Sequence, residues 1–381
     1  MTMKLNAIEI ASLITLIQLL LLAVIVFNYK KGRRLSNRLL GGFLVSNALL
    51  PGHYFLLLFH WIPAPAGPYV WIMGGAAYAL LMPFLYLYIQ SLCDHTFRIK
   101  PVHLLHGLPY VIIVVFFSII FGLKQYASWL TAVQQTDQTF FKLMQAVINA
   151  QVAVYLVVIF KVIADYRRKI KDFYSTIDQI NLQWFKILLF GFTVMWLMNF
   201  AQWILWVTGI QPGKINDTLT FVSVIINLLF ALIVTYNSIV KSDYLSGIAV
   251  PGRYPGSRLN TADYKKIIQK LISYMDKNKP YLNSALSLKD LEQNLHIPAR
   301  NISQSIHVCL NSNFYEFVNQ YRIEEVKCRL GDKSFQHLSI LGLAYETGFN
   351  SKSVFNNAFK KYVGMTPKQF KHSLLERSDR K

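Results

Sequence analysis

Hydrophobic residues in the first 240 positions fall into long runs separated by short polar segments. A helix needs about 20 apolar residues to cross the hydrocarbon core of a bilayer, which is roughly 30 Å thick. Seven runs have that length, near residues 8–27, 38–59, 69–91, 104–122, 142–163, 183–208 and 216–240. Pro51 interrupts the second run, which we expect to form a kinked helix because neighbouring helices can satisfy a broken backbone. The pattern therefore predicts a seven-helix transmembrane bundle over residues 1–240.

The hydrophobic pattern changes after a short break. Residues 241–260 contain three glycines and two prolines and have no helical period, which is typical of a linker. From residue 261 to 381 the apolar positions recur every three or four residues, as in amphipathic helices of soluble domains. We therefore expect an all-α chain in which the membrane bundle is followed by a soluble helical domain.

The first part of the soluble domain predicts a pair of short helices. Ser287 and Asp290 are spaced to cap the start of a helix over residues 288–294. A turn at 295–297 follows, and Pro298 suits the first turn of a second helix because its missing amide donor is not needed there. Two short helices joined by such a turn form a helix-turn-helix unit.

The second part repeats this arrangement after a longer connecting helix at about residues 314–330. Leu343 and Ala344 mark one short helix, Gly348 ends it, and Asn350 or Ser351 is placed to cap the next. Phe355 and Phe359 are expected to point inward from that helix, and Thr366 and Pro367 to begin a final one. The sequence thus predicts two helix-turn-helix units.

The motifs in this region resemble a known family. The stretch ILGLAYETGFNSKSVFNNAFKKYVGMTPKQFK is similar to the C-terminal signature of AraC/XylS-type transcription regulators, and the resemblance extends over roughly residues 262–375. His296, Pro298 and the pair Ile306-His307 depart from the usual pattern of the first unit. The whole chain resembles membrane-anchored regulators of this type with an N-terminal multi-span sensor, which implies sequence-specific binding to double-stranded promoter DNA.

Candidate DNA contacts follow from the helical period, since a recognition helix buries one face and presents the other to the major groove. Asparagine can pair with adenine, and lysine can reach guanine or a phosphate. A face that meets only solvent is the alternative interpretation of each position. The candidates in the first unit are Arg300, Asn301, Ser303, Gln304 and His307, the last toward a phosphate; those in the second are Lys352, Ser353, Asn356, Asn357, Lys360 and Lys361.

Charge separates the two halves and orients the spans. The chain is 54% hydrophobic, yet its formal net charge is +20. Basic residues cluster after the first, third and fifth apolar runs, whereas the other loops hold at most one. Because Lys and Arg accumulate on the cytoplasmic side, we expect a bacterial inner-membrane protein with its N-terminus outside and its C-terminal domain in the cytoplasm. From Lys241 onward 22 basic residues oppose 12 acidic ones, which favours a phosphate-bearing partner.

These patterns favour a one-component transcription regulator whose membrane domain senses a signal. Its expected partners are promoter DNA, the lipid bilayer and an unknown signal ligand or protein, and a homodimer is also considered. The alternative is a receptor or transporter-like membrane protein whose C-terminal domain binds proteins. We expect no enzyme, cofactor or metal, since HExxH, GxSxG, CxxC and phosphate-binding glycine loops are missing from the sequence. Polar residues inside the spans, such as Asn47 and Asn227, can mark a ligand pocket but more often serve as interhelical hydrogen-bond partners, which is the interpretation we favour.

Overall fold

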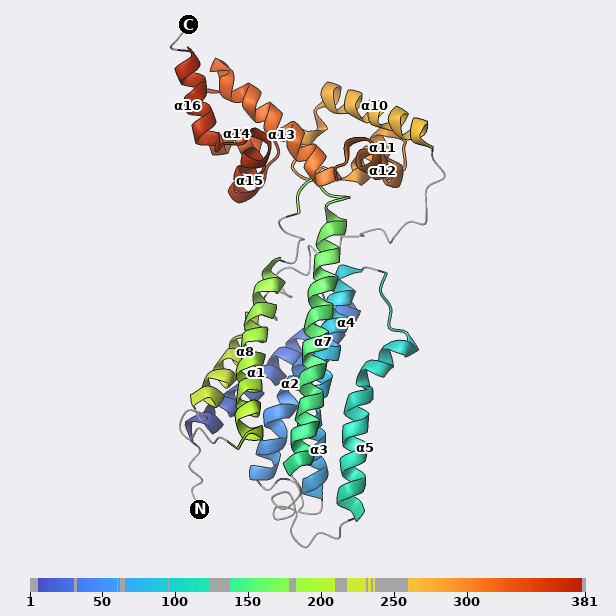
Figure 1. Ribbon diagram of the computed structural model, residues 1–381, viewed down its shortest axis with the longest axis vertical. Coiled ribbons are helices and arrows are strands. Elements are labelled where there is room, and N and C mark those ends of the chain that lie inside the picture. The colour runs from blue at the N-terminus through green and yellow to red at the C-terminus, as the bar shows by residue number, and fades with distance from the viewer. Residues whose placement is uncertain are drawn as a thin grey trace. The chain divides into compact units, whose positions relative to one another are not determined.

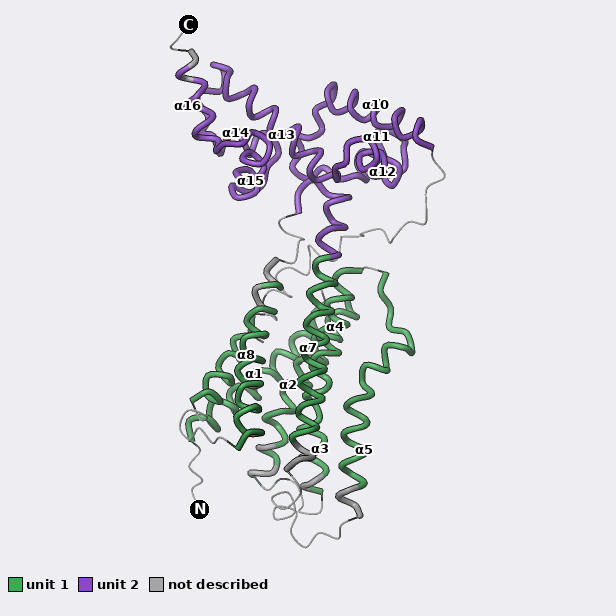
Figure 2. Tube along the Cα trace, in the orientation of Figure 1, with its two compact units in different colours: residues 1–164, 182–249 green, residues 165–181, 250–381 purple. Residues whose placement is uncertain are grey.

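The computed structural model describes residues 6–30, 33–59, 61, 66–94, 96–123, 138–177, 183–209, 218–230, 232–233, 236 and 260–378. Within these ranges every named element is helical, as expected for an all-α chain. The chain divides into two compact units (Figure 2). Unit 1 comprises residues 1–164 and 182–249, and unit 2 comprises residues 165–181 and 250–381.

Unit 1 consists of long apolar helices that pack side by side (Figure 1). They are α1 (Ala7–Asn28), α2 (Arg34–Leu58), α3 (Gly67–Ala76), α4 (Tyr78–Cys93), α5 (Leu108–Leu123), most of α7 (Gln138–Ile170), α8 (Gln183–Val207) and a further helix at Thr218–Phe230. A 3-10 turn at Pro101–Gly107 leads into α5. The helix α2 packs against both α1 and α4.

Five helical segments of the described chain are long and apolar enough to cross a membrane: Ala7–Asn28, Ile72–Cys93, Pro101–Ile119, Lys142–Ile170 and Leu189–Val207. They match five of the seven expected spans. The second expected span, residues 38–59, coincides with α2, a helix that contains Pro51 but is not among the five. The seventh, residues 216–240, is described mainly as the shorter helix Thr218–Phe230. The count of seven stays a prediction.

Polar side chains inside unit 1 join helices to one another. The amides of Asn47 and Asn227 exchange two hydrogen bonds, of 2.9 and 3.1 Å. Gln151 donates to the carbonyl oxygen of Ala79 at 3.0 Å. An amide in a helix bundle that lacks water needs such a partner. These contacts agree with the interhelical role expected for the polar residues.

Unit 2 contains the helices of both expected helix-turn-helix units (Figure 1). They are α10 (Thr261–Asn278), α11 (Leu288–Leu295), α12 (Ala299–Leu310), α13 (Phe314–Gly331), α14 (Ile340–Glu346), α15 (Lys352–Val363) and α16 (Pro367–Ser378). Short 3-10 turns lie at Pro280–Leu282 and Lys333–Phe335. The expected linker, residues 241–260, lies outside the described residues except for Asn260.

The helix starts follow the predicted caps with two corrections. The Ser287 side chain and Asp290 form the expected reciprocal cap of α11. Pro298 is the residue before α12 rather than its first helical residue, because its ψ of 132° lies outside the helical range. Ser351 stands at the start of α15 but does not cap it, since its hydroxyl group lies 2.9 Å from that of Ser353.

Two left-handed residues set the turns of the helix-turn-helix units. His296 ends α11 with a φ of 54°, a conformation that costs glycine little and other residues more. Gly348 follows α14 with a φ of 95°, and a Cβ placed there would lie 2.5 Å from the carbonyl oxygen of Tyr281. The turn after α14 therefore requires glycine for both its conformation and the close approach of a neighbouring backbone.

Each helix-turn-helix unit has its own hydrophobic core. The first cluster gathers buried residues of α10, α11, α12 and the start of α13, including Leu271, Leu291 and Ile302. The second gathers Ile323 and Val326 of α13 with residues of α14 and α15. The helix α13 contributes to both clusters and so connects the two helix-turn-helix units, as expected.

Candidate nucleic-acid interface

The second recognition helix, α15, separates its residues cleanly by polarity. Phe355 and Phe359 are 1% and 0% exposed and pack edge to face at 5.7 Å between ring centroids. The opposite face carries all six predicted contacts of this unit, and all are exposed: Lys352, Ser353, Asn356, Asn357, Lys360 and Lys361. An exposed helix face with amide and ammonium groups can enter a DNA major groove and meet base edges and phosphates.

Lys361 differs from the other residues of this face. Its Nζ lies 2.8 Å from Oε1 of Glu316, which is in the first turn of α13. The neighbouring Tyr362 hydroxyl donates to the backbone oxygen of Glu316 at 3.1 Å. Burial, and then the Glu316 carboxylate, raise the pKa of Tyr362 to about 12, so its hydroxyl stays protonated. Lys361 thus lies at the edge of the face, beside α13, where a phosphate contact suits it better than a base contact.

The first recognition helix, α12, is less open than α15. Ile302, Ser305 and Ile306 are buried toward α10 and α11. Arg300, Asn301, Ser303 and Gln304 are partly exposed, and His307 is exposed. The Oε1 atom of Gln304 accepts a hydrogen bond from the Tyr264 hydroxyl of α10 at 3.2 Å. This bond occupies one acceptor position of Oε1 and orients the amide of Gln304, a restriction that the helical period alone does not reveal.

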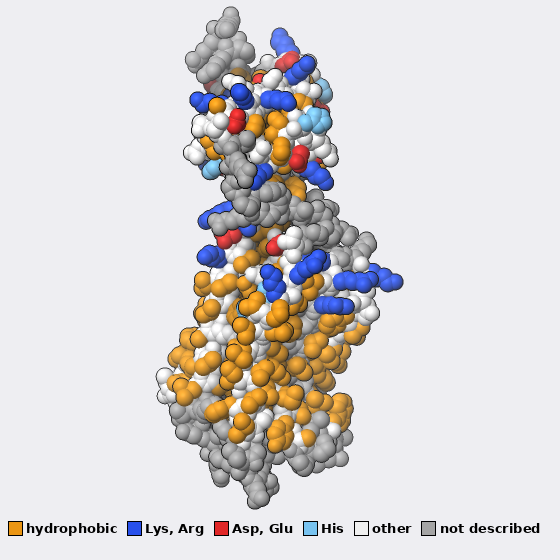
Figure 3. All heavy atoms as spheres, turned by 90° about the vertical axis from the view of Figure 1, so that its right-hand side faces the viewer, with side chains coloured by type: hydrophobic (Ala, Val, Ile, Leu, Met, Phe, Trp, Pro, Cys, Tyr) orange, Lys and Arg blue, Asp and Glu red, His pale blue; other side chains and the backbone are white. Residues whose placement is uncertain are grey.

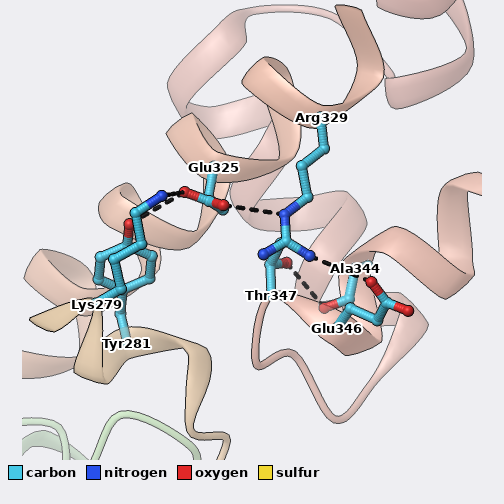
Figure 4. A network of polar contacts seen from close by, with 7 residues as sticks. All are labelled: Lys279, Tyr281, Glu325, Arg329, Ala344, Glu346 and Thr347. Carbon is cyan, nitrogen blue, oxygen red and sulfur yellow. Dashed lines mark hydrogen bonds and ion pairs between the residues drawn. The ribbon is translucent and has the colours of Figure 1, made fainter. Parts of the chain in front are cut away.

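Within unit 2, a polar network crosses from the first helix-turn-helix unit to the second through α13 (Figure 4). Glu325 of α13 accepts from Lys279 at 2.9 Å and from the Tyr281 hydroxyl at 3.1 Å. Arg329, one turn further, donates to Glu325 at 3.0 Å and to Glu346 of α14 at 3.2 Å. Burial alone would raise the pKa of Glu325, but hydrogen bonds from Lys279 and Arg329 lower it overall. The carboxylate therefore stays charged at neutral pH. Together with Arg329 it links both helix-turn-helix units to the connecting helix α13.

Sequence reasoning missed Arg322, which is 1% exposed in the interior of unit 2. It lies on α13 four residues after Val318 and four before Val326, both fully buried. Its position on this apolar stripe of the helix could have indicated that it is buried. Its guanidinium donates to the backbone oxygens of Tyr281 at 2.8 Å and Asn283 at 2.9 Å. Burial lowers its pKa to about 10, which leaves it charged at neutral pH. A buried charge of this kind needs its hydrogen-bond partners in place.

Comparisons with known proteins agree with this geometry. Residues 291–373 match the family described as "Helix-turn-helix domain". The chain is 26% identical over 104 residues to the melibiose operon regulatory protein of Escherichia coli K12, and equally to that of E. coli O6:H1. The matched part covers 27% of this chain and 32% of the relative, so the chain spans about a third of the length of these curated relatives.

A solved structure of a protein of unknown function from Listeria innocua is also similar, with 26% identity. The similarity covers 28% of this chain and 95% of that one, with a TM-score of 0.25. The family match spans α12 and α15 together with the connector α13. The helix-turn-helix match and the similarity to a melibiose operon regulator support an AraC-type DNA-binding transcription regulator.

Proposed function

We propose that the chain is a membrane-embedded one-component regulator that binds promoter DNA through α12 and α15 in response to a signal sensed by unit 1. The observation that carries the DNA-binding part is the exposed face of α15, where Lys352, Asn356 and Asn357 stand opposite the buried Phe355 and Phe359. A protein-interaction module has no need of amide and ammonium groups presented in this way on a recognition helix.

The membrane part of the proposal is supported by the surface of unit 1. Large apolar side chains point outward along its helices, among them Leu21 at 59%, Ile112 at 56% and Val157 at 70% exposure. Figure 3 shows apolar side chains covering much of the visible face of these helices, with Lys and Arg side chains gathered toward one end of them. Exposed apolar area on this scale is unfavourable in water and favourable in hydrocarbon. Lipid is therefore the surrounding that fits unit 1.

The orientation of the spans makes a direct prediction. A reporter enzyme that is active only in the cytoplasm should be active when fused after Lys241 and inactive when fused near Pro65, because the distribution of basic loops predicts that these sites lie on opposite sides. Enzyme activity of the two fusions, compared at equal fusion-protein levels, measures this. Activity near Pro65 and none after Lys241 would show that the orientation is the reverse of the proposed one. The C-terminal domain would then lie outside the compartment that holds the chromosome.

DNA binding predicts a steep dependence on salt. The full chain in nanodiscs of zwitterionic lipid should bind labelled duplex DNA at low salt, and neutralising 6–10 phosphates would weaken binding by about 10³–10⁵ between 50 and 200 mM salt. Zwitterionic lipid is used because an anionic surface would compete for the same cations. Fluorescence anisotropy of the labelled duplex measures the affinity. A folded chain without affinity at low salt would favour the protein-interaction alternative.

A further inference from the structure

A short segment between α7 and α8 belongs to unit 2 and not to unit 1. The chain enters unit 2 at Asp165, within α7, and leaves it at Asn181. Residues Lys171–Ile177, called here the docking segment, form contacts with the first helix-turn-helix unit. In the sequence the segment lies far from that helix-turn-helix unit, with Ser175 and Leu286 separated by 111 residues.

The backbone of the docking segment pairs with the entry of α11. Tyr174 and Ser287 form an isolated antiparallel bridge. The amide of Ser175 donates to the oxygen of Leu286 at 3.2 Å, and the amide of Leu288 donates to the oxygen of Phe173 at 3.0 Å. Because these hydrogen bonds flank the Tyr174–Ser287 pair, it is a non-hydrogen-bonded pair, whose Cα atoms lie about 4.5 Å apart. The segment is thus held in one register against the start of α11.

Side chains of the segment complete the surroundings of Arg322. Nη1 of Arg322 donates to the backbone oxygen of Ser175 at 3.2 Å, and Nη2 donates to its hydroxyl oxygen at 3.1 Å. The Thr176 hydroxyl lies 3.4 Å from Nη1 and donates to the oxygen of Ser284 at 2.7 Å. Without the segment, the nearest remaining acceptor of Nη1 is Asn319 at 3.5 Å. Loss of these acceptors would leave a buried charge without partners, which strongly destabilises a folded domain.

The remaining contacts of the docking segment are with other parts of the first helix-turn-helix unit. Phe173 packs against the hydrophobic cluster that contains Leu291 and Ile302. The backbone oxygen of Lys171 accepts from the amide of Tyr315 at 2.9 Å, one of the first-turn donors of α13 that have no partner within the helix. Burial raises the pKa of the Asp172 carboxyl overall, and His307 of α12 acts in the opposite direction. The segment therefore contacts the entry of α11, the start of α13 and the hydrophobic cluster that these helices share with α12.

We propose that the docking segment is a structural part of the DNA-binding domain and the element through which unit 1 controls it. When the segment is docked, Arg322 is fully partnered and the first helix-turn-helix unit can bind DNA. When it withdraws, Arg322 loses its acceptors and α11–α13 loosen. This control rests on the proposed function, whereas the docking itself does not. The chain would then connect the two units through the docking segment as well as through residues 241–260.

Docking is tested in the full chain by a disulfide. Tyr174→Cys and Ser287→Cys are introduced after Cys93, Cys309 and Cys328 are replaced by serine, and membranes are treated with a mild oxidant. A non-hydrogen-bonded antiparallel pair has the geometry that a disulfide needs. Both cysteines should then escape labelling with a maleimide reagent until a reductant is added, whereas each single-cysteine variant stays labelled. Continued labelling of the oxidised double variant would overturn docking.

Control of DNA binding is tested by undocking the segment. Ser175→Pro removes the amide that donates to Leu286 and changes no residue of the helix-turn-helix units, and Phe173→Ala removes the core contact. Each should weaken DNA binding of the full chain in nanodiscs at least tenfold, while Arg168→Ala, exposed at the end of α7, should leave it unchanged. Normal DNA binding by a Ser175→Pro chain that no longer forms the disulfide would overturn control. A chain that forms the disulfide but never binds DNA would instead contradict the proposed function.

Discussion

Replacing Phe359 by alanine is expected to unfold the second helix-turn-helix unit while leaving the first in place. Phe359 is fully buried and packs edge to face with Phe355 at 5.7 Å and with Phe370 at 5.6 Å. Truncating a buried phenylalanine costs about 3–5 kcal/mol through lost burial and the remaining cavity. The second hydrophobic cluster is small, so this loss is a large part of its stability. DNA binding should fail together with the fold.

Amide hydrogen exchange on the full chain measures this effect locally. Exchange should accelerate by roughly two to four powers of ten in α14, α15 and α16, since the cost of local opening falls by about 3–5 kcal/mol. The helices α11 and α12, whose core is a separate cluster, serve as the internal reference. Asn356→Ala is the matched control, because Asn356 lies on the exposed face of the same helix. Unchanged exchange in the Phe359 variant would mean that this ring does not hold the second unit together.

The second large effect is a loss of DNA-sequence specificity when residues on the exposed face of α15 are replaced by alanine. Asn357→Ala and Lys352→Ala should each cost roughly 1–3 kcal/mol on the preferred site and relax the choice of base there, since we propose that these side chains face base edges. Both residues are exposed, so neither change opens a cavity. Binding curves on the preferred duplex and on a scrambled duplex, compared for each variant, measure the loss.

Lys361→Ala provides the contrasting result. Its ammonium lies at the edge of the α15 face, 2.8 Å from Glu316, where a phosphate is the expected DNA partner. The variant should weaken binding about equally on both duplexes and reduce the salt slope by about one unit, because phosphate contacts carry no sequence information. If the Asn357 and Lys361 variants behaved alike on good and poor sites, the assignment of the groove-facing surface would be wrong.

Much of unit 2 could be predicted because its sequence signals are local. The Ser287–Asp290 cap and the placement of Phe355 and Phe359 depend on residues within one or two helical turns, and the structure confirms them. The exposed positions of α15 follow from the same period. One prediction failed because of a neighbour: the hydroxyl of Ser351, one of the two residues expected to cap α15, lies 2.9 Å from that of Ser353 instead.

Contacts between distant parts of the chain were out of reach of this reasoning. The hydrogen bond between Gln304 and Tyr264 joins residues 40 positions apart, and that between Arg322 and Ser175 joins residues 147 positions apart. The segment containing Ser175 lies between two apolar runs, so its sequence predicts only a loop between spans. In unit 1 the hydrophobic runs predicted where helices lie, but Pro51 and the polar residues of α2 left the number of spans open.

The most direct test of the account is where the full chain lies on the chromosome in living cells. Chromatin immunoprecipitation of the tagged chain should recover a small set of discrete sites, and the double variant Lys352→Ala, Asn357→Ala should lose them while it remains in the membrane at a normal level. Discrete sites that persist in the double variant would move base reading away from α15. A membrane-inserted wild-type chain that enriches no chromosomal site would contradict the proposed function itself.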